Sequence, residues 1–146
     1  MNRILRDDID SIDANIYLMT HATNPLLSNK TINQVIGKFV DNKDGHDSLF
    51  TVNKVQSRFY KKDLTPVNHD PDNLVRTQDL EPWYEENSCL YLFTKDSFHK
   101  TNARIGKSPM MYVIPKLEAV DIDEPDDWEK AEALALYRLD RGEIKG

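Results

Sequence analysis

Short apolar runs alternate with segments of helical periodicity along this chain of 146 residues. The apolar runs lie at 15–21, 48–55, 89–93 and 110–114. Apolar residues recur every three or four positions at 4–12, at 31–40 and in the region after Pro125, and 95–100 fits one or two helical turns. This alternation predicts an α/β fold, in which helices flank a layered sheet, within a single domain that covers 1–146.

The first apolar run, 15–21, contains four consecutive apolar residues without polar alternation. Such a run is typical of a strand covered on both faces in a parallel sheet. It ends in the polar turn Thr20–Pro25, and ligands of open α/β sheets bind at the carboxyl ends of strands. The turn is therefore a candidate binding loop, unless Asn24 and Pro25 are only a turn signal.

Two helices have a clear apolar face. For the helix at 31–40 we expect Thr31 as the N-cap, with Gln34 completing a capping box. Its buried face would hold Ile32, Val35, Ile36, Phe39 and Val40. In the C-terminal helix the buried face is predicted to hold Trp128, Ala131, Leu134 and Ala135, with Leu139 extending it.

An acidic stretch joins the last apolar segment to the C-terminal helix. Asp121 and Asp123 would share one face if the chain is extended there, because successive side chains of a strand point to opposite faces. A carboxylate pair at a strand end suits Mg²⁺, which takes oxygen ligands and usually keeps one or two carboxylates plus substrate phosphates. The structural alternative is that Asp123 caps the helix, while Asp126 and Asp127 occupy its first turn.

Composition narrows the class of protein. The formal net charge is −6, from 19 Lys and Arg against 25 Asp and Glu, which argues against nucleic acid or an anionic membrane as partner. No apolar run approaches the roughly 20 residues of a membrane span, and the N-terminus lacks the apolar core of a signal peptide. Cys89 is the single cysteine, so no internal disulfide forms. We expect a buried Cys89 and a reducing, cytoplasmic setting.

The region from 56 to 88 has no clear periodicity. Arg58 and two lysines lie near Phe59 and Tyr60, which indicates either a basic lining or, as we favour, a solvated edge. The guanidinium of Arg76 suits a carboxylate or phosphate, although a structural ion pair is the commoner fate of such an arginine.

Four motifs together resemble the acylneuraminate cytidylyltransferases, the CMP-sialic acid synthetase family. They are Thr20-His-Ala-Thr-Asn-Pro-Leu26, Arg76-Thr-Gln-Asp-Leu80, Glu86-Asn-Ser-Cys-Leu-Tyr91 and Val120-Asp-Ile-Asp-Glu-Pro-Asp-Asp-Trp-Glu-Lys-Ala-Glu132. Each motif is weak alone, but their order and spacing are fairly specific, and they cover the chain from about Asn15 to Leu136. The resemblance implies a nucleotide-diphosphosugar transferase (Rossmann-like) fold and a homodimer, with 56–88 as a dimerisation or substrate-pocket segment.

The resemblance also implies an activity: transfer of CMP from CTP to a sialic acid-like sugar acid, with Mg²⁺ and release of pyrophosphate. Asp121 and Asp123 match the family's metal-binding aspartates, and Arg76 matches an arginine that binds the anionic sugar or phosphates. The substrate-binding residues implied are His21, Thr23, Asn24, Arg58, Gln78 and Asn87. His21 stands where many members have glutamine, and Ser88 replaces a common glycine. Arg58 is the candidate for a basic residue that enters the partner subunit's site.

One family feature has no counterpart in this sequence. The family begins with a strand and a Gly-rich, basic loop that cradles the CTP phosphates, and none of the five glycines lies in such a pattern. The chain therefore resembles the C-terminal part of the family, and we expect the sheet to be incomplete at its N-terminus. It would be a fragment, or the nucleotide half would lie on another chain. Two alternatives stay open: a non-catalytic α/β module for dimerisation or sugar binding, and an unrelated Mg²⁺-dependent phosphoryl-transfer fold.

Overall fold

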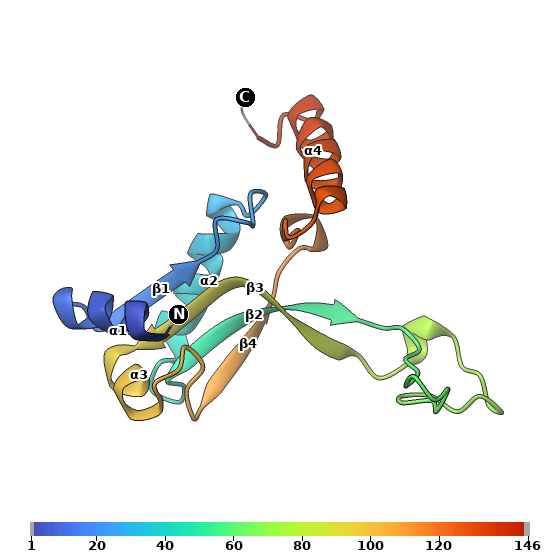
Figure 1. The fold of residues 1–146 in the computed structure, drawn as a ribbon, viewed down its shortest axis with the longest axis horizontal. Helices are drawn as coiled ribbons and strands as arrows, with labels where there is room; N and C mark the ends of the chain where they lie inside the picture. Colours follow the sequence, from blue (N-terminus) through green and yellow to red (C-terminus); the bar gives the residue numbers. More distant parts are fainter. Residues whose placement is uncertain (1, 145–146) are drawn as a thin grey trace.

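The fold is built around a four-stranded mixed sheet in the order β1-β3-β2-β4. A computed structural model describes residues 2–144 of the chain (Figure 1). The strands are β1 (Ile16–Thr20), β2 (Ser48–Val55), β3 (Trp83–Thr94) and β4 (Pro109–Val113). Both β1 and β2 run antiparallel to β3, whereas β4 runs parallel to β2. The predicted α/β class and the four predicted strands are confirmed.

Helices cover both faces of this sheet. On one face α2 (Asn29–Asn42) packs Val35 and Phe39 against Leu90 and Leu92 of β3. On the other face α1 (Asn2–Ser11) and α3 (Lys95–Thr101) pack Ile9 and Phe98 against Tyr91 and Phe93. Successive side chains of a strand point to opposite faces, so β3 supplies both halves of the core.

The prediction that 15–21 forms a doubly covered strand of a parallel sheet was wrong. β1 is an antiparallel edge strand, and Leu18 at its centre is 40% exposed. The apolar run has a different cause, because α1 folds back on one side of the strand. There the Tyr17 hydroxyl donates hydrogen bonds to the carbonyls of Ile9, at 3.0 Å, and Ile12, at 2.6 Å.

The start of α2 differs from its prediction by one turn. Ser28 is the N-cap, and its Oγ accepts a hydrogen bond from the Thr31 amide at 3.2 Å. Thr31 is itself buried inside the first turn. The expected capping box of Thr31 and Gln34 is therefore wrong, because the helix begins earlier and the serine already occupies the capping position.

A long arm, residues 56–82, leaves the sheet between β2 and β3 and contains the short helix η1 (Thr77–Asp79). Figure 1 shows it reaching well beyond the helices that cover the sheet. Its base is a stack of Phe59 on Trp83, with ring centroids 5.3 Å apart. Farther out, the Asn68 side chain accepts from the Phe59 amide at 2.9 Å and donates to the Ser57 carbonyl at 2.8 Å. The arm is thus ordered largely by its own hydrogen bonds.

After β4 the chain passes through the short helix η2 (Lys116–Glu118) into α4 (Pro125–Asp140), which stands off the sheet in Figure 1. Ala131 and Arg138 are the buried residues of α4. Trp128 was predicted to be buried but is 61% exposed, because it lines an open apolar groove with Pro25 and Leu26. Within residues 2–144, no helix is both long and apolar enough to cross a bilayer.

Candidate functional site

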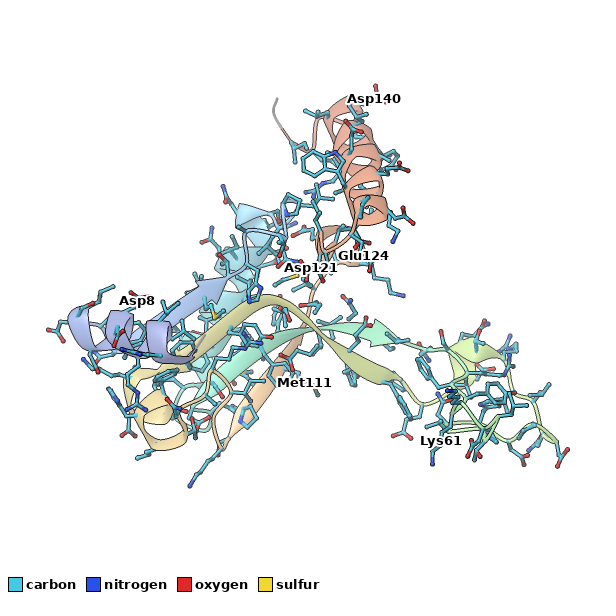
Figure 2. The ribbon with its side chains drawn as sticks, in the orientation of Figure 1. Asp8, Lys61, Met111, Asp121, Glu124 and Asp140 are labelled. Atoms are coloured by element: carbon cyan, nitrogen blue, oxygen red, sulfur yellow. The ribbon has the colours of Figure 1, made fainter. Side chains whose placement is uncertain are left out.

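Asp121 lies where the sheet meets the base of α4, in irregular chain between η2 and that helix (Figure 2). The expectation of a strand end was wrong, because β4 already ends at Val113. The segment around Asp121 instead lies against the turn that follows β1. The Ile122 amide donates to the Thr23 carbonyl at 3.0 Å, and the Asn24 side chain donates to the Val120 carbonyl at 3.2 Å. The predicted binding turn and the predicted metal ligand are therefore neighbours.

A cavity of about 230 Å³ opens beside Asp121. Its other lining residues come from β2, from the polar half of β3 and from the segment after η2: Asn53, Glu85, Glu86, Asn87, Ser88 and Ala119. The Oδ1 atom of Asp121 is buried and has no hydrogen-bond partner among the described residues. The same is true of His21 Nε2 and Asn24 Oδ1 in the adjoining turn. Buried polar atoms nearly always find a partner, and Asp121 Oδ1 is the one of these three whose residue lines the cavity, so it is the atom that a ligand there would satisfy.

Asn87 makes three side-chain hydrogen bonds inside the protein. Its Oδ1 accepts from Thr51 Oγ1 at 2.7 Å and from the Cys89 amide at 3.2 Å. Its Nδ2 donates to Asn53 Oδ1 at 3.1 Å, and Asn53 in turn donates to Glu85 Oε2 at 3.1 Å. This network lies where the pairing of β2 with β3 shifts register, between Phe50 and Val52. Asn87 therefore orients Asn53 and Glu85 at the cavity.

The residue after Asn87 keeps the backbone conformation that a glycine would favour. Ser88 has φ of 57°, in the left-handed region. Its hydroxyl accepts a hydrogen bond from the buried Tyr91 hydroxyl at 3.2 Å, and Tyr91 also donates to Glu86. Burial raises the pKa of Tyr91, and the hydrogen bond to Glu86 raises it further. The guanidinium of Arg104 lies 4.0 Å from the centre of the Tyr91 ring and 3.8 Å from Glu86.

Cys89 is excluded as a nucleophile. Burial, together with the negative charges of Asp121 and Glu118, raises the pKa of its thiol to about 12. The thiolate is the reactive form of cysteine, so this side chain is inert near neutral pH and serves as core. The prediction of a buried structural cysteine is confirmed.

The acidic side chains fit a cation that is completed by its substrate. Within the described part of the chain, no group of three or more His, Cys, Asp or Glu side chains is placed to hold a metal ion. Mg²⁺ needs fewer protein ligands, because it commonly takes one or two carboxylates and fills its remaining positions with water and phosphate. The unpartnered Asp121 Oδ1 is suited to this, and the exposed Asp123 follows two residues later.

The first turn of α4, which follows Asp123, contains the acidic residues expected at a helix start. Asp126 and Asp127 do lie in the first turn of α4. Asp127 Oδ2 accepts from the Glu124 amide at 3.2 Å and from the Asp123 amide at 3.4 Å. The N-cap is Glu124 rather than Asp123, so the Asp123 carboxylate is not used in that position.

Three predicted site residues lie on the arm and not beside the cavity. Arg76 pairs with Asp79 at 2.8 Å, Arg58 donates to the Val75 carbonyl at 2.6 Å, and Gln78 belongs to η1. Figure 2 shows Lys61 of the arm far from Asp121. One copy of the chain therefore places the turn of His21, Thr23 and Asn24 against the Asp121 segment, and Asn87 lines the cavity with Asp121. Arg58, Arg76 and Gln78 lie on the arm instead.

The model of the family described as "Cytidylyltransferase" matches residues 3–145. The chain belongs to this family. No curated protein sequence matches the chain. Among solved structures, it is similar to 4-diphosphocytidyl-2C-methyl-D-erythritol synthase from Anaerococcus prevotii, at TM-score 0.59 and 10% identity, covering 92% of this chain and 64% of the synthase. It is also similar to CMP:2-keto-3-deoxy-manno-octonic acid synthetase complexed with CTP, at TM-score 0.59 and 12% identity, covering 94% of this chain and 68% of the synthetase.

These likenesses concern the fold of the chain alone. It spans 64% of the length of the erythritol synthase. Sequence reasoning missed Asn53, Glu85 and Glu118 near the site. A signal for Asn53 does exist, since Thr51 and Asn53 are polar residues within β2, but their partners on β3 lie more than thirty positions away.

Proposed function

We propose that this chain binds the sugar acid and the divalent cation of a cytidylyltransferase reaction, in which CMP passes from CTP to a sialic acid-like sugar acid. The observation that carries the proposal is the unpartnered Asp121 Oδ1 in a polar cavity, beside a turn with two further unpartnered polar atoms. Membership in the cytidylyltransferase family supports the reaction class. The single buried, unpaired cysteine suits the reducing compartment of the cytoplasm, where we propose the protein works.

In the proposed reaction a sugar hydroxyl oxygen loses its proton to water and forms a bond to the α-phosphorus of CTP. The bond from that phosphorus to the oxygen that bridges the α- and β-phosphates breaks, and pyrophosphate leaves with that oxygen and the electron pair of the bond. Asp121 and Asp123 would hold Mg²⁺, which when bound neutralises phosphate charge. His21 and Asn24 would fix the sugar by hydrogen bonds from the turn after β1. Asn87 would act through Asn53 and Glu85, because its oxygen and one of its N–H groups are already hydrogen-bonded within the protein.

A homodimer is part of the proposal because the cavity has an acidic lining. Glu85, Glu86 and Asp121 line it, and no lysine or arginine is among its lining residues. A sugar acid brings another negative charge, which a cation in addition to Mg²⁺ and to the Arg104 beside Glu86 would help to offset. The arm carries Arg58 and Arg76 away from its own cavity, and the arm of a second copy would bring them to it.

The test measures CTP-dependent release of pyrophosphate by the full chain with Mg²⁺. The acceptors are N-acetylneuraminic acid, 2-keto-3-deoxy-manno-octonic acid and a 2C-methyl-D-erythritol phosphate. Binding of each acceptor is followed in parallel by saturation-transfer NMR. We expect a sugar acid to bind and, with CTP, to release pyrophosphate, and Asp121→Asn to abolish release while the fold stays intact. Full release by Asp121→Asn, or a response to the erythritol phosphate alone, would contradict the proposal.

The alternative is a non-catalytic module that binds the sugar or mediates dimerisation, and one observation favours it. Among the described residues no glycine lines the cavity: Gly37 is within α2, Gly45 follows it, Gly106 packs against Asp47 and Gly142 follows α4. A phosphate-cradling loop is thus not found beside Asp121 in this part of the chain. Saturation transfer to a sugar acid without pyrophosphate release would favour this module.

A further inference from the structure

Glu118 is a buried carboxylate that reaches a distant part of the chain. It is 9% exposed and lies at the end of η2, three positions before Asp121. Its Oε2 accepts from the Ser28 amide at 2.9 Å, and its Oε1 accepts from the Ser28 hydroxyl at 3.0 Å. Ser28 is the N-cap of α2. A buried charge is costly unless it is hydrogen-bonded, and the amino end of a helix supplies both donors and a favourable dipole.

This contact is the first of three along the same segment. After Glu118 binds Ser28, the Val120 carbonyl accepts from Asn24 at 3.2 Å, and the Ile122 amide donates to the Thr23 carbonyl at 3.0 Å. Asp121 lies between the last two contacts. Its flanking backbone is therefore fixed on both sides, although the segment is neither helix nor strand.

Of these three contacts, the one between Glu118 and Ser28 is the only one that involves a charged group. The three contacts follow one another in order along the two segments. Residues 118–122 and residues 23–28 form two antiparallel stretches of irregular chain, because Glu118 meets Ser28 while Ile122 meets Thr23. Ala119, which follows Glu118, packs against the core cluster that contains Cys89 and Leu90 of β3, so the segment is held against the sheet. Loss of the Glu118 contact would leave the segment that carries Asp121 held to residues 23–28 only by the Val120 and Ile122 hydrogen bonds.

We propose that Glu118 is a positioning residue, which fixes the 118–122 segment on the amino end of α2 and thereby sets the place of Asp121 at the cavity. Its consequence for cation binding rests on the function proposed above. The role differs from that of a ligand, since both oxygens of Glu118 are occupied by Ser28. Glu118→Gln retains the acceptor for the Ser28 amide and loses the charge, whereas Glu118→Ala loses both.

The test compares these two variants with Asp47→Asn in the full chain. Asp47 is a matched control, because its carboxylate also bridges to distant backbone amides, those of Lys107 at 2.9 Å and Ser108 at 3.1 Å, but it is not among the residues that line the cavity. Two quantities are measured: hydrogen exchange of the Ile122 amide by NMR, and affinity for Mn²⁺ from the electron paramagnetic resonance signal of the free ion.

We expect Glu118→Ala to speed exchange at Ile122 by about tenfold or more, as a local opening becomes easier. Affinity for Mn²⁺ should fall by about tenfold, the effect expected of a group that orients a ligand, and Glu118→Gln should fall between it and the unmodified chain. Asp47→Asn should change neither quantity.

Unchanged exchange at Ile122 in Glu118→Ala would overturn the proposal, whatever the cation does. An equal loss of Mn²⁺ affinity in Asp47→Asn would also overturn it, because the effect would then be one of general stability. If the unmodified chain binds no Mn²⁺ but Ile122 exchange responds to Glu118→Ala, the cation role of Asp121 fails and the positioning role of Glu118 stands.

Discussion

The sheet with its covering helices and the arm bury their apolar residues to very different extents. Within the sheet and its covering helices, Tyr91 of β3, Phe39 of α2 and Phe98 of α3 have no exposed surface. On the arm, Leu64 is 80% exposed and Leu74 is 63% exposed. Both regions contain aromatic and aliphatic side chains, so composition alone does not separate them.

The difference shows what each region can do in a single copy. The sheet closes its own core on two faces, and its ends can therefore hold polar atoms such as Asp121 Oδ1 in fixed places. The arm holds its shape through hydrogen bonds such as Arg58 to Val75 and presents apolar side chains outward. Leu64 and Leu74 are exposed apolar side chains that a second copy could cover, as the proposed homodimer requires.

The largest expected effect comes from cutting into the sheet core. Phe39→Ala should lower the free energy of unfolding by about 3–5 kcal/mol, because it leaves a cavity beneath α2. Leu64→Ala on the arm should change it by less than about 0.5 kcal/mol, as expected for a surface position. Urea denaturation followed by circular dichroism measures both. Equal losses would erase the distinction between the two regions.

The attachment of α4 to the sheet should show an intermediate effect. Arg138 is 6% exposed and donates to the Leu26 carbonyl at 2.7 Å. Arg138→Met should cost about 1–3 kcal/mol, because a buried carbonyl loses its partner. Arg141→Met is the matched control, since Arg141 is exposed and pairs with Glu143 at 2.7 Å. The two variants are compared by urea denaturation, and similar midpoints would mean that α4 does not depend on Arg138.

A smaller effect, visible only through its pH dependence, is expected at Asp47. Burial alone would raise the pKa of this carboxyl, but hydrogen bonds from the Lys107 and Ser108 amides and from the Ser48 hydroxyl hold it below the ordinary value of 3.8. A lowered folded-state pKa stabilises the protein above the unfolded-state pKa, and this contribution disappears as the pH falls through the folded-state pKa.

The stability difference between the unmodified chain and Asp47→Asn should therefore be full near neutral pH and shrink below about pH 4. Thermal unfolding between neutral pH and acid measures this difference. A gap that stays constant across the range would show that the carboxylate charge of Asp47 does not contribute.

The smallest effect on unfolding should accompany a large effect on association. Leu74→Asp on the arm should leave the unfolding of the monomer within about 0.5 kcal/mol and should convert a dimer to a monomer in sedimentation equilibrium. Leu136→Asp on α4 is the matched control, because Leu136 is 61% exposed and Leu74 is 63% exposed. If only the Leu136 variant dissociated the dimer, the interface would lie on α4 and not on the arm.

Much of the sheet and its helices follows from local patterns. The periodicity of 31–40 and the apolar run of 48–55 are properties of neighbouring residues, and α2 and β2 formed there. The edge position of β1 could not be predicted, because it depends on which strand pairs with it. The polar half of β3 could not be predicted either. The sequence around Glu85 and Glu86 is typical of a loop, and these residues form a strand because they pair with Asn53 and Val52 of β2.

The site was predictable to a similar degree. Asp121 and the turn after β1 stand out by residue type, and the structure places them side by side. Glu118 and Asn53 could not be assigned, since their roles depend on contacts between segments 90 and 32 positions apart. Trp128 was wrongly predicted to be buried. Helical spacing identifies the apolar face of α4 but does not show which residues of that face have the sheet beneath them.

The most direct test of the central claim is Mn²⁺ binding by the full chain, measured by electron paramagnetic resonance for the unmodified protein, Asp121→Asn and the matched control Asp126→Asn. Asp126 is also acidic and exposed, but it lies in the first turn of α4. We predict saturable binding that Asp121→Asn removes and Asp126→Asn retains. Binding unaffected by Asp121→Asn, or no saturable binding by the unmodified protein, would contradict the account.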